Sequence, residues 1–338
     1  NFFLISRKTP KYKIFRYCKN CNFIFHLAGA NRPKKKIKFK LDNIDYTNFI
    51  LEGLKNNTNK PIIFYSSSIK INDKTVYGKS KKETEKNIIN FCKNRNLKYY
   101  ILRLPNIYGK WAKPYYNSFL STIFYEITRD RKVKKISKSK KIPIIYIDDL
   151  TTELEKLLFS KKKSFIKNVK GNKYTIFLLY KKILDMWKNW KINKVKNTST
   201  SLDRKLFSTM ISYIPEKKFF TSFNQNIDER GNFSEFLKTE KSGQFSFFTI
   251  NPSKSRGRHY HNSKNERFLL LSGKVHLELI NMKNFKKIKK TISSKKPVIF
   301  TSVPGWKHTF INNGKERAIV IVWANEIFNP KKADTYNL

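Results

Sequence analysis

Short apolar runs in the first third of the chain alternate with stretches whose apolar residues recur every three or four positions. The runs are typical of strands buried on both faces of a parallel sheet, and the spaced residues are typical of helices packed on it. This alternation predicts an α/β domain with a Rossmann-like, doubly wound parallel sheet. The runs fall within residues 21–33, 62–65 and 100–104, and the helical stretches within residues 43–56 and 77–94.

The pattern changes at residue 227, after which short apolar segments are separated by Gly, Pro and Asn turns. In one segment Val275, Leu277 and Leu279 alternate with His276 and Glu278, the period of an antiparallel strand with one buried face. Segments of this kind predict an all-β barrel of the jelly-roll type. The expected strands cover residues 244–250, 268–271, 275–280, 298–301 and 318–323.

This change of pattern predicts two domains. We expect residues 1–200 to form the α/β domain and residues 222–338 the barrel. The linker is expected at residues 201–221, within the stretch 195–222 that is rich in Asn, Ser and Thr and contains Pro215. The first twenty residues are basic and contain no glycine. The α/β domain is therefore expected to lack the first strand and the Gly-rich turn with which a dinucleotide-binding fold begins.

The net charge is strongly positive, +48 from 72 Lys and Arg against 24 Asp and Glu in 338 residues. By itself this balance would suggest a nucleic-acid partner. The lysines are spread along the whole chain, however, and Arg, which favours bidentate phosphate and base contacts, is scarce. Asn, Ile, Phe and Tyr are also abundant, and all the enriched residues have A/T-rich codons. We interpret the charge as genome composition, so a nucleic-acid partner is not expected.

Cys18, Cys21 and Cys92 are too few for a disulfide framework, which favours a reducing, cytoplasmic compartment. Cys18 and Cys21 form a single C-x-x-C pair, and without a second pair a zinc or redox site is not favoured. No uninterrupted apolar run approaches the roughly 20 residues of a membrane-spanning helix, so no membrane partner is expected.

One group of candidate catalytic residues follows the second apolar run. Tyr77 and Lys81 lie four residues apart at the start of a predicted helix, so their side chains share a face. A lysine ammonium beside a phenol would lower the pKa of Tyr77 and make it a general acid, while Ser68 or its neighbour Ser67 could polarise a carbonyl oxygen. Such a trio suits the reduction of a ketone by a nicotinamide. A solvent-facing pair is the alternative interpretation of Tyr77 and Lys81 alone.

A second group of candidates lies in the barrel half. His259 and His261 leave the same face of a strand, Glu266 follows five residues later, and His308 comes from the later string P-G-W-K-H. Three imidazoles and a carboxylate can close around one divalent cation, and these ligand types allow Zn, Fe, Mn or Ni. The alternative is a hydrogen-bonded histidine cluster in a barrel that holds no metal.

Both halves resemble known families. The strings H-L-A-G-A-N-R-P, S-S-S-I, Y-G-K-S-K and P-N-I-Y-G, in this order, are similar to the extended short-chain dehydrogenase/reductases. The strings H-Y-H-N-S-K-N-E and P-G-W-K-H-T-F-I-N resemble the two cupin motifs. The whole, with D-E-R-G-N-F-S-E-F-L-K-T and A-D-T-Y-N-L, resembles the bifunctional capsular-polysaccharide enzymes of the CapF/WbjC type, UDP-2-acetamido-2,6-dideoxy-hexos-4-ulose reductases.

This resemblance implies three sets of site residues. Those at the nicotinamide cofactor, NADPH, are Leu27, Ala28, Gly29, Tyr77 and Lys81. Those at the substrate are Asn31, Arg32 and Asn106. Those that hold Zn²⁺ in the cupin are His259, His261, Glu266 and His308.

The resemblance also implies a function for a homodimer. The cupin would epimerise C3 of a UDP-linked 4-keto-6-deoxy-hexosamine, and the reductase would then reduce C4 with NADPH, on the route to UDP-N-acetyl-L-fucosamine. The ketone acidifies the C3 proton, so reduction has to come second. Two other interpretations stay open. One is an epimerase or sugar-binding cupin beside a truncated or decayed reductase, and the other is a basic nucleic-acid-binding protein.

Overall fold

The computed structural model describes residues 2–6, 8–116, 118–134 and 136–337. The chain divides into two compact units: Asn1–Lys181 with Ser208–Ile214, and Lys182–Phe207 with Pro215–Leu338. It therefore passes between the units at three places, within helix α7 (Ile176–Trp190), within helix α8 (Ser201–Ser212) and after residue 214.

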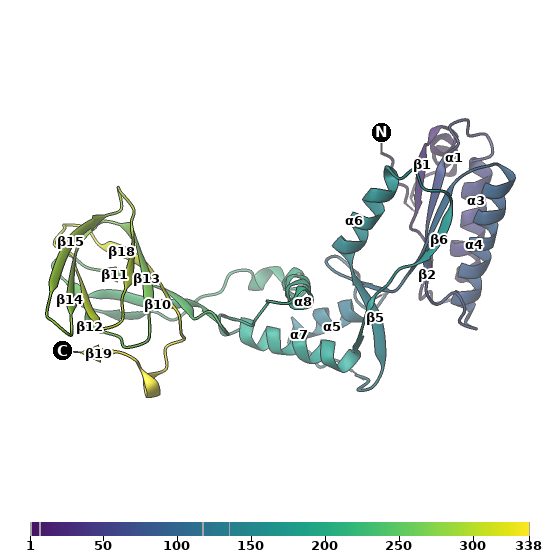
Figure 1. The fold of residues 1–338 in the computed structure, drawn as a ribbon. Helices are drawn as coiled ribbons and strands as arrows, with labels where there is room; N and C mark the ends of the chain where they lie inside the picture. The colour runs from purple at the N-terminus through teal and green to yellow at the C-terminus, as the bar shows by residue number, and fades with distance from the viewer. Residues whose placement is uncertain (1, 7, 117, 135, 338) are drawn as a thin grey trace. The chain divides into compact units, whose positions relative to one another are not determined.

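The first unit contains a four-stranded parallel sheet, which confirms the predicted fold class (Figure 1). The three apolar runs of the sequence form its first three strands, and β6 follows much later in the chain. The strand order is β1-β2-β3-β6, and every neighbouring pair is parallel. The strands are β1 (Phe23–His26), β2 (Ile62–Ser68), β3 (Tyr99–Leu104) and β6 (Phe165–Asn168).

Successive residues of β2 and β3 are buried against opposite faces of this sheet. Ile63, Tyr65 and Ile101 pack into the core beneath α1, α3 and α4, while Phe64 and Tyr100 pack into the core beneath α6. Figure 1 shows these helices on the two sides of the sheet. Burial on both faces explains why the strands are continuous apolar runs. The helices are α1 (Lys11–Asn20), α3 (Tyr46–Gly53), α4 (Val76–Asn94) and α6 (Ile147–Leu158).

Smaller elements complete this unit. A short helix and a π-helical segment lead into α3, and a three-stranded sheet of order β4-β5-β7 lies beyond β3 in the chain. These elements are α2 (Ile37–Phe39), η1 (Lys40–Asp45), β4 (Asn106–Tyr108), α5 (Phe119–Ile127), β5 (Lys141–Tyr146) and β7 (Asn172–Thr175).

The second unit contains the predicted jelly-roll barrel. One sheet has the order β16-β13-β18-β11-β10-β8, with β9 paired to β10, and the other has the order β15-β14-β17-β12-β19. Their inner faces share one apolar core that includes Phe248, Leu270, Leu277, Phe310 and Val320. All five expected strands are present, in β11, β13, β14, β16 and β18.

The elements of the second unit are listed here in chain order. Its strands are β8 (Lys194–Val195), β9 (Asn226–Asp228), β10 (Gly231–Thr239), β11 (Gln244–Ile250), β12 (Ser255–Tyr260), β13 (Glu266–Ser272), β14 (Lys274–Asn281), β15 (Lys287–Ser293), β16 (Ile299–Ser302), β17 (Trp306–Ile311), β18 (Ala318–Ala324) and β19 (Tyr336–Asn337). Two 3-10 turns, η2 (Glu216–Lys218) and η3 (Pro330–Lys332), lie outside the barrel strands.

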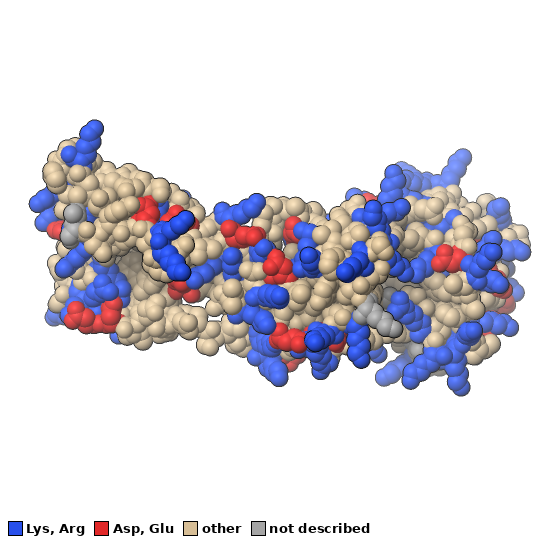
Figure 2. Space-filling model, turned by 90° about the horizontal axis from the view of Figure 1, so that it is seen from below, with Lys and Arg blue, Asp and Glu red and all other residues tan. Residues whose placement is uncertain are grey.

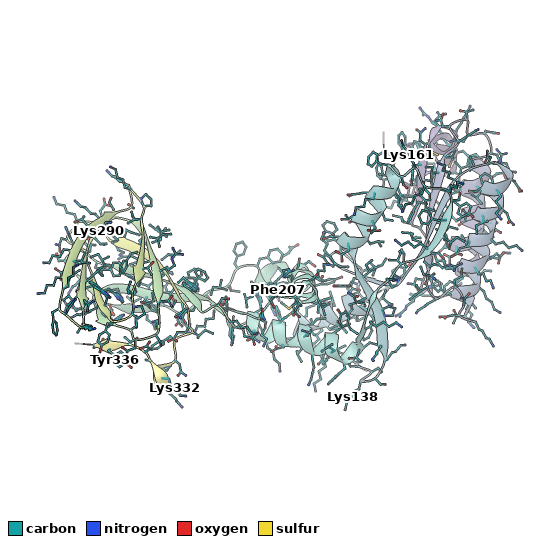
Figure 3. The ribbon with its side chains drawn as sticks, in the orientation of Figure 1. Lys138, Lys161, Phe207, Lys290, Lys332 and Tyr336 are labelled. Atoms are coloured by element: carbon teal, nitrogen blue, oxygen red, sulfur yellow. The ribbon has the colours of Figure 1, made fainter. Side chains whose placement is uncertain are left out.

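Helix α8 occupies much of the segment whose composition predicts a linker. Leu206 and Met210 are fully buried, and Tyr213, just after the helix, is also buried. Figure 3 shows the neighbouring Phe207 on this helix. The segment thus contributes to the packed cores, because its few apolar residues recur at helical spacing among Ser and Thr.

Basic side chains outnumber acidic ones on the face of the molecule shown in Figure 2. Lys and Arg side chains are spread over the face shown in Figure 2, with Asp and Glu between them. Among the described residues, none of the helices has the length and apolar character needed to span a membrane.

Candidate active site and metal centre

Ser68, Tyr77 and Lys81 come together at the carboxyl end of the parallel sheet, where α/β folds bind their ligands. Ser68 is the last residue of β2, and Tyr77 and Lys81 lie in the first turns of α4. The helix begins there because Thr75 caps it, its hydroxyl accepting the Gly78 N–H at 3.1 Å. Ser68 hydrogen-bonds to the Tyr77 hydroxyl.

The pKa of Tyr77 differs from the expectation. Burial raises it above its ordinary value, and the hydrogen bond from Ser68 lowers it by less. The Lys81 Nζ donates to the Ser66 carbonyl at 3.0 Å and lies 4.7 Å from the centroid of the Tyr65 ring. Tyr77 is therefore protonated at neutral pH, as a proton donor must be.

Lys81 is itself strongly perturbed. Its side chain is buried, and burial lowers the pKa of Lys81 to about 8, while the Glu85 carboxylate acts in the opposite direction. Glu85 is in turn held by Arg103, whose Nε and Nη2 donate to its two oxygens at 3.1 and 2.7 Å. Buried titratable groups with shifted pKa values often mark active sites.

Asn43 is a residue that our sequence analysis missed. Its side-chain oxygen accepts the Ala30 N–H at 2.6 Å, and its nitrogen donates to the Ala30 carbonyl and to the Ser80 hydroxyl at 3.2 and 2.9 Å. The loop after β1 is thereby tied to α4. No local sequence pattern marks this Asn as a functional residue. Its position on the apolar face of a predicted helix could have indicated a buried side chain that needs hydrogen-bond partners.

The loop after β1 carries the other expected cofactor residues. Leu27 and Ala28 are exposed, with Leu27 at 58%, and Gly29 packs so closely that a Cβ there would lie 2.8 Å from Asn43 Oδ1 and 3.4 Å from Lys81 Nζ. A glycine is needed for this approach. Leu27, Ala28 and Gly29 thus lie at the same sheet end as Lys81.

The expected substrate residues are more widely placed. Asn31 is half-buried and Arg32 exposed, both in the loop that follows Ala30. Asn106 opens β4, and its side-chain nitrogen donates to the Pro143 carbonyl at 3.0 Å, so this donor holds β5 in place. No contact among the described residues joins these three to Ser68, Tyr77 or Lys81.

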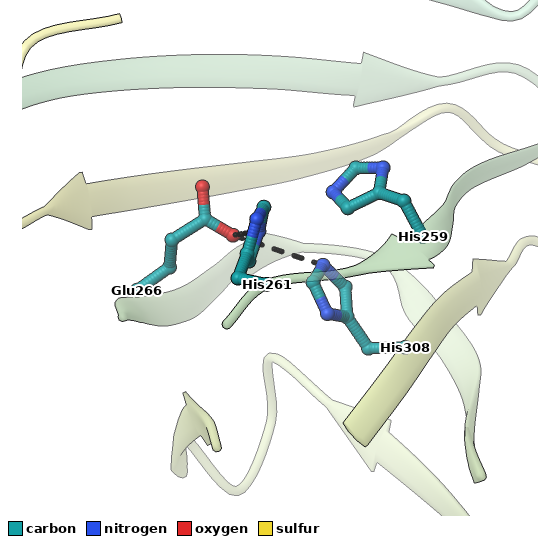
Figure 4. A group of neighbouring side chains, drawn as sticks. All are labelled: His259, His261, Glu266 and His308. Carbon is teal, nitrogen blue, oxygen red and sulfur yellow. Dashed lines mark hydrogen bonds and ion pairs between the residues drawn. The ribbon is translucent and has the colours of Figure 1, made fainter. Parts of the chain in front are cut away.

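His259, His261, Glu266 and His308 form one cluster inside the barrel (Figure 4). Their potential ligand atoms all lie within 4.8 Å of one another. The His261 Nε2 is 3.0 Å and the His308 Nε2 3.7 Å from Oε2 of Glu266. His259 is the last residue but one of β12, His308 lies opposite on β17, and Glu266 opens β13 of the other sheet. Only His259 is partly exposed.

The protonation states suit a divalent cation. Burial lowers the pKa of His259 to about 4 and that of His308 to about 3, so both imidazoles are neutral near pH 7. Burial would raise the pKa of Glu266, but hydrogen bonds from His261 and the charge of Lys264 bring it down to about 2. Neutral imidazoles and an ionised carboxylate are the forms that bind metal.

A second layer of contacts orients these ligands. Ser302 is buried, and its hydroxyl lies 3.2 Å from Nδ1 of His308, which leaves Nε2 facing Glu266. Lys264 Nζ lies 2.9 Å from Oε1 of Glu266, the oxygen turned away from the histidines. Partners of this kind orient most metal-binding histidines and carboxylates. Our sequence analysis missed both residues.

Comparisons with known proteins cover both halves. Residues 8–164 match the NAD dependent epimerase/dehydratase family, and residues 226–336 match the polysaccharide biosynthesis C-terminal domain. The chain is 35% identical over 320 residues to the UDP-2-acetamido-2,6-beta-L-arabino-hexul-4-ose reductase of Pseudomonas aeruginosa, which covers 94% of this chain and 86% of that protein.

Solved structures agree over the full length. The capsular polysaccharide assembling protein CapF from Staphylococcus aureus has a TM-score of 0.89 and 31% identity, covering 99% of this chain and 92% of its own. A structure of CapF with the inhibitor 3-isopropenyl-tropolone has a TM-score of 0.83 and 28% identity, covering 99% and 91%. This chain therefore belongs to the family of CapF-like capsular polysaccharide biosynthesis proteins.

Proposed function

We propose that this chain is a bifunctional nucleotide-sugar enzyme. Its cupin half epimerises C3 of a UDP-2-acetamido-2,6-dideoxy-4-keto-hexose, and its reductase half then reduces the C4 ketone with NADPH, on the route to UDP-N-acetyl-L-fucosamine for capsule or O-antigen. The observation that carries the proposal is that one chain assembles both the Ser68–Tyr77–Lys81 group and the cluster around His308. The order follows from chemistry, because reduction removes the ketone that makes the C3 proton acidic.

In the reductase half, the residues present act on the ketone oxygen. Tyr77 gives its proton to that oxygen, Ser68 donates a hydrogen bond to it, and the charge of Lys81 stabilises the developing alkoxide. A bound NADPH supplies the hydride to C4. Asn31, Arg32 and Asn106 remain our candidates for contacts with the sugar nucleotide.

The fit of the cofactor is uneven along its length. Leu27, Ala28 and Gly29, with Tyr77 and Lys81, are suited to the nicotinamide end of the cofactor. Gly29 lies close to Lys81, and the exposed Leu27 side chain is accessible to a ligand. Among the residues of this sequence, Gly29 is the first glycine, so the contacts identified here are those of the nicotinamide end alone. The second candidate function is an epimerase or sugar-binding cupin whose reductase half does not act on the ketone.

In the cupin half, three imidazoles and one carboxylate fit Zn²⁺, the ion that we assign to His259, His261, Glu266 and His308. When bound, Zn²⁺ acts as a Lewis acid that stabilises negative charge on an oxygen. His261, Glu266 and His308 are buried, and partly exposed His259 marks the side on which a substrate can approach. Tropolone, whose neighbouring ketone and hydroxyl oxygens form a chelating pair, is a suitable probe of this site.

We also propose a homodimer built on the cupin half. The outer face of its larger sheet has an open depression of about 410 Å³ lined by Phe245, Arg267, Phe268, Leu269, Ile299 and Trp323. Ile299 is 60% exposed and Leu271, on the same sheet, is 52% exposed. An apolar sheet face of this kind favours a second copy of the chain. Light scattering should give twice the chain mass, and I299K should shift it toward the monomer.

The cytoplasm remains our expected compartment, because the cofactor and the nucleotide sugar are cytoplasmic metabolites and Cys18, Cys21 and Cys92 are unpaired.

The test gives the full chain the UDP-linked 4-keto sugar and NADPH in D₂O, and reads the product by mass spectrometry. Deuterium at C3 with a reduced C4 supports both activities. Deuterium with an intact ketone supports the second candidate. Y77F should reproduce that pattern in an active enzyme, while Y12F, which changes a tyrosine 70% exposed, should behave as wild type. An unchanged sugar contradicts the proposal.

A further inference from the structure

Asp334 makes an unusual number of contacts with the loop between two of the cluster residues. Its Oδ1 accepts the Asn262 N–H at 2.9 Å, and its Oδ2 accepts the N–H groups of Ser263 and Lys264, both at 2.7 Å. The Ser263 hydroxyl donates to the same Oδ2 at 2.9 Å. One carboxylate thus satisfies three successive backbone donors and a side chain.

The backbone of the same residue contacts a cluster histidine. The Asp334 carbonyl lies 2.5 Å from Nδ1 of His261. A carbonyl can only accept, so Nδ1 must carry a proton, and Nε2, which donates to Glu266 in the metal-free chain, is the nitrogen whose lone pair becomes available when a cation displaces its proton. Nε2 is the atom that lies 3.0 Å from Glu266. Asp334 therefore selects the His261 tautomer in which the cluster-facing nitrogen is free to bind a cation.

The segment around Asp334 is itself anchored to the strand that carries the histidines. In β19, Tyr336 and Asn337 pair with Tyr260 and His259 of β12. The Tyr260 and Tyr336 rings stack with centroids 5.2 Å apart, and Tyr336 is labelled beside the barrel in Figure 3. Residues 333–337, which we name the C-terminal strap, run along β12 and the loop after it.

The loop that Asp334 holds also determines the position of the Glu266 carboxylate. The anchored loop joins His261 directly to Glu266, and Lys264, whose N–H is bound by Asp334, places its Nζ 2.9 Å from Oε1 of Glu266. A shift of the loop would thus move one imidazole, the carboxylate and its lysine partner together. Asp334 lies more than sixty residues away in sequence from all of them.

We propose that Asp334 is a positioning residue of the metal centre, which fixes the His261 tautomer through its carbonyl and the spacing of His261 and Glu266 through its carboxylate. This inference rests on the proposed Zn²⁺ site. Partners that orient metal ligands typically change metal affinity about 10- to 100-fold when they are removed.

The experiment uses the metal-free full chain and the variants D334N, D334A and E240Q. E240Q is the matched control, because Glu240 also accepts a backbone N–H, that of Asn197 at 3.1 Å, in the same unit but from a different loop. Zn²⁺ affinity is measured by competition with a chromophoric chelator, and the ligand geometry by the visible absorption spectrum of the Co²⁺-loaded protein. Nitrogen NMR shifts of the His261 ring report its tautomer without any metal.

We expect D334A to bind Zn²⁺ about 10- to 100-fold more weakly, with an altered Co²⁺ spectrum, and D334N to show a smaller change in the same direction. E240Q should match wild type in both. Nδ1 of wild-type His261 should be protonated. D334A keeps the carbonyl that accepts this proton but loses the carboxylate that holds the carbonyl in place, so the Nδ1 shift should move toward that of a ring without this hydrogen bond. If D334A does not fold, the nearly isosteric D334N decides.

The outcomes separate the two proposals. Wild-type affinity and Co²⁺ spectra in both Asp334 variants would overturn the positioning role while leaving the zinc site intact. Absence of Zn²⁺ binding by the wild-type chain would instead overturn the metal site on which the inference rests.

Discussion

The ammonium group of Lys81 is bound to the carbonyl oxygen of Ser66, 3.0 Å away, at the end of the strand that also carries Ser68. Lys81 is thus buried at the carboxyl end of the sheet, with a pKa of about 8. Its charge, rather than a direct contact with Tyr77, is what it offers to a substrate oxygen.

We predict that kcat/KM for ketone reduction falls above about pH 8. Above its pKa Lys81 loses the proton and with it the positive charge, so the rate should drop about tenfold per pH unit on that limb. K81R keeps its charge at all accessible pH values and should remove the limb, even if its rate is lower. K82R, at the exposed neighbouring position, is the control and should still show the decrease in kcat/KM above about pH 8. A flat profile from pH 7 to 10 in wild type would contradict this role.

The buried histidines of the barrel predict acid sensitivity of the metal-free chain. The pKa values of His259 and His308, about 4 and 3, lie below the ordinary 6.5, so the unfolded chain binds more protons between these values. Stability is therefore full above about pH 6.5 and is lost as the pH falls toward 4.

The measurement is the thermal unfolding midpoint of the chelator-treated protein between pH 7 and 5. H308Q should reduce the slope of the midpoint against pH. H276Q is the control, because His276 is half-exposed on β14, where its Nδ1 contacts the Thr291 hydroxyl at 2.9 Å. An equal loss of slope in both variants would argue against burial at the cluster as the cause.

Two glycines of the barrel allow the cost of backbone strain at positive φ to be separated from the cost of a steric clash by an added Cβ. Gly257 and Gly305 have φ angles of +93° and +75°, but a Cβ at Gly257 would lie 2.6 Å from the His308 carbonyl oxygen, whereas Gly305 has no atom within 4 Å. Both G257A and G305A carry the backbone strain of a left-handed residue, about 1–2 kcal/mol. We predict that G257A costs about 1–3 kcal/mol more and also weakens Zn²⁺ binding. Equal losses in urea unfolding would refute the contact.

The buried pair of Glu85 and Arg103 predicts a large effect of removing one partner. The Glu85 side chain is 4% exposed and has Arg103 as its ion-pair partner at 2.7 Å. R103M would leave that carboxylate uncompensated, at a cost of about 3–5 kcal/mol. R95M should cost little, because Arg95 is exposed, where it donates to the Lys55 carbonyl and lies over the Phe91 ring. The double variant E85L/R103M should be more stable than R103M alone.

Part of the fold could be predicted from the sequence, because buried strands and helices have apolar residues at characteristic spacings. Strand β11 coincides with an expected strand, since its apolar residues form a run between two turns. Strand β15 was not expected, because six of the seven residues in K-I-K-K-T-I-S are at least partly exposed and only Ile292 is buried. Helix α8 was taken for a linker, because it follows a stretch rich in Asn, Ser and Thr and its own apolar residues are interspersed with Ser and Thr.

The candidate site was predictable to the extent that its residues are close in sequence. Tyr77 and Lys81 share one helix, and His259, His261 and Glu266 lie on β12, in the loop after it and at the start of β13. The lowered pKa expected for Tyr77 was wrong, because sequence spacing says nothing of the burial that raises it. Asn43, Ser302 and Asp334 act across the fold, and no local pattern distinguishes them from other polar residues.

The three passages of the chain between its units limit how the two units could have been joined in one chain. A fusion of two separate genes at one point would leave a single crossing, whereas here residues 208–214 return to the first unit after residues 182–207 have joined the second. Met210 and Tyr213 would be lost from any reductase fragment cut before α8. Shuffling a different cupin onto this reductase would therefore require a junction after residue 214 and a replacement for residues 182–207.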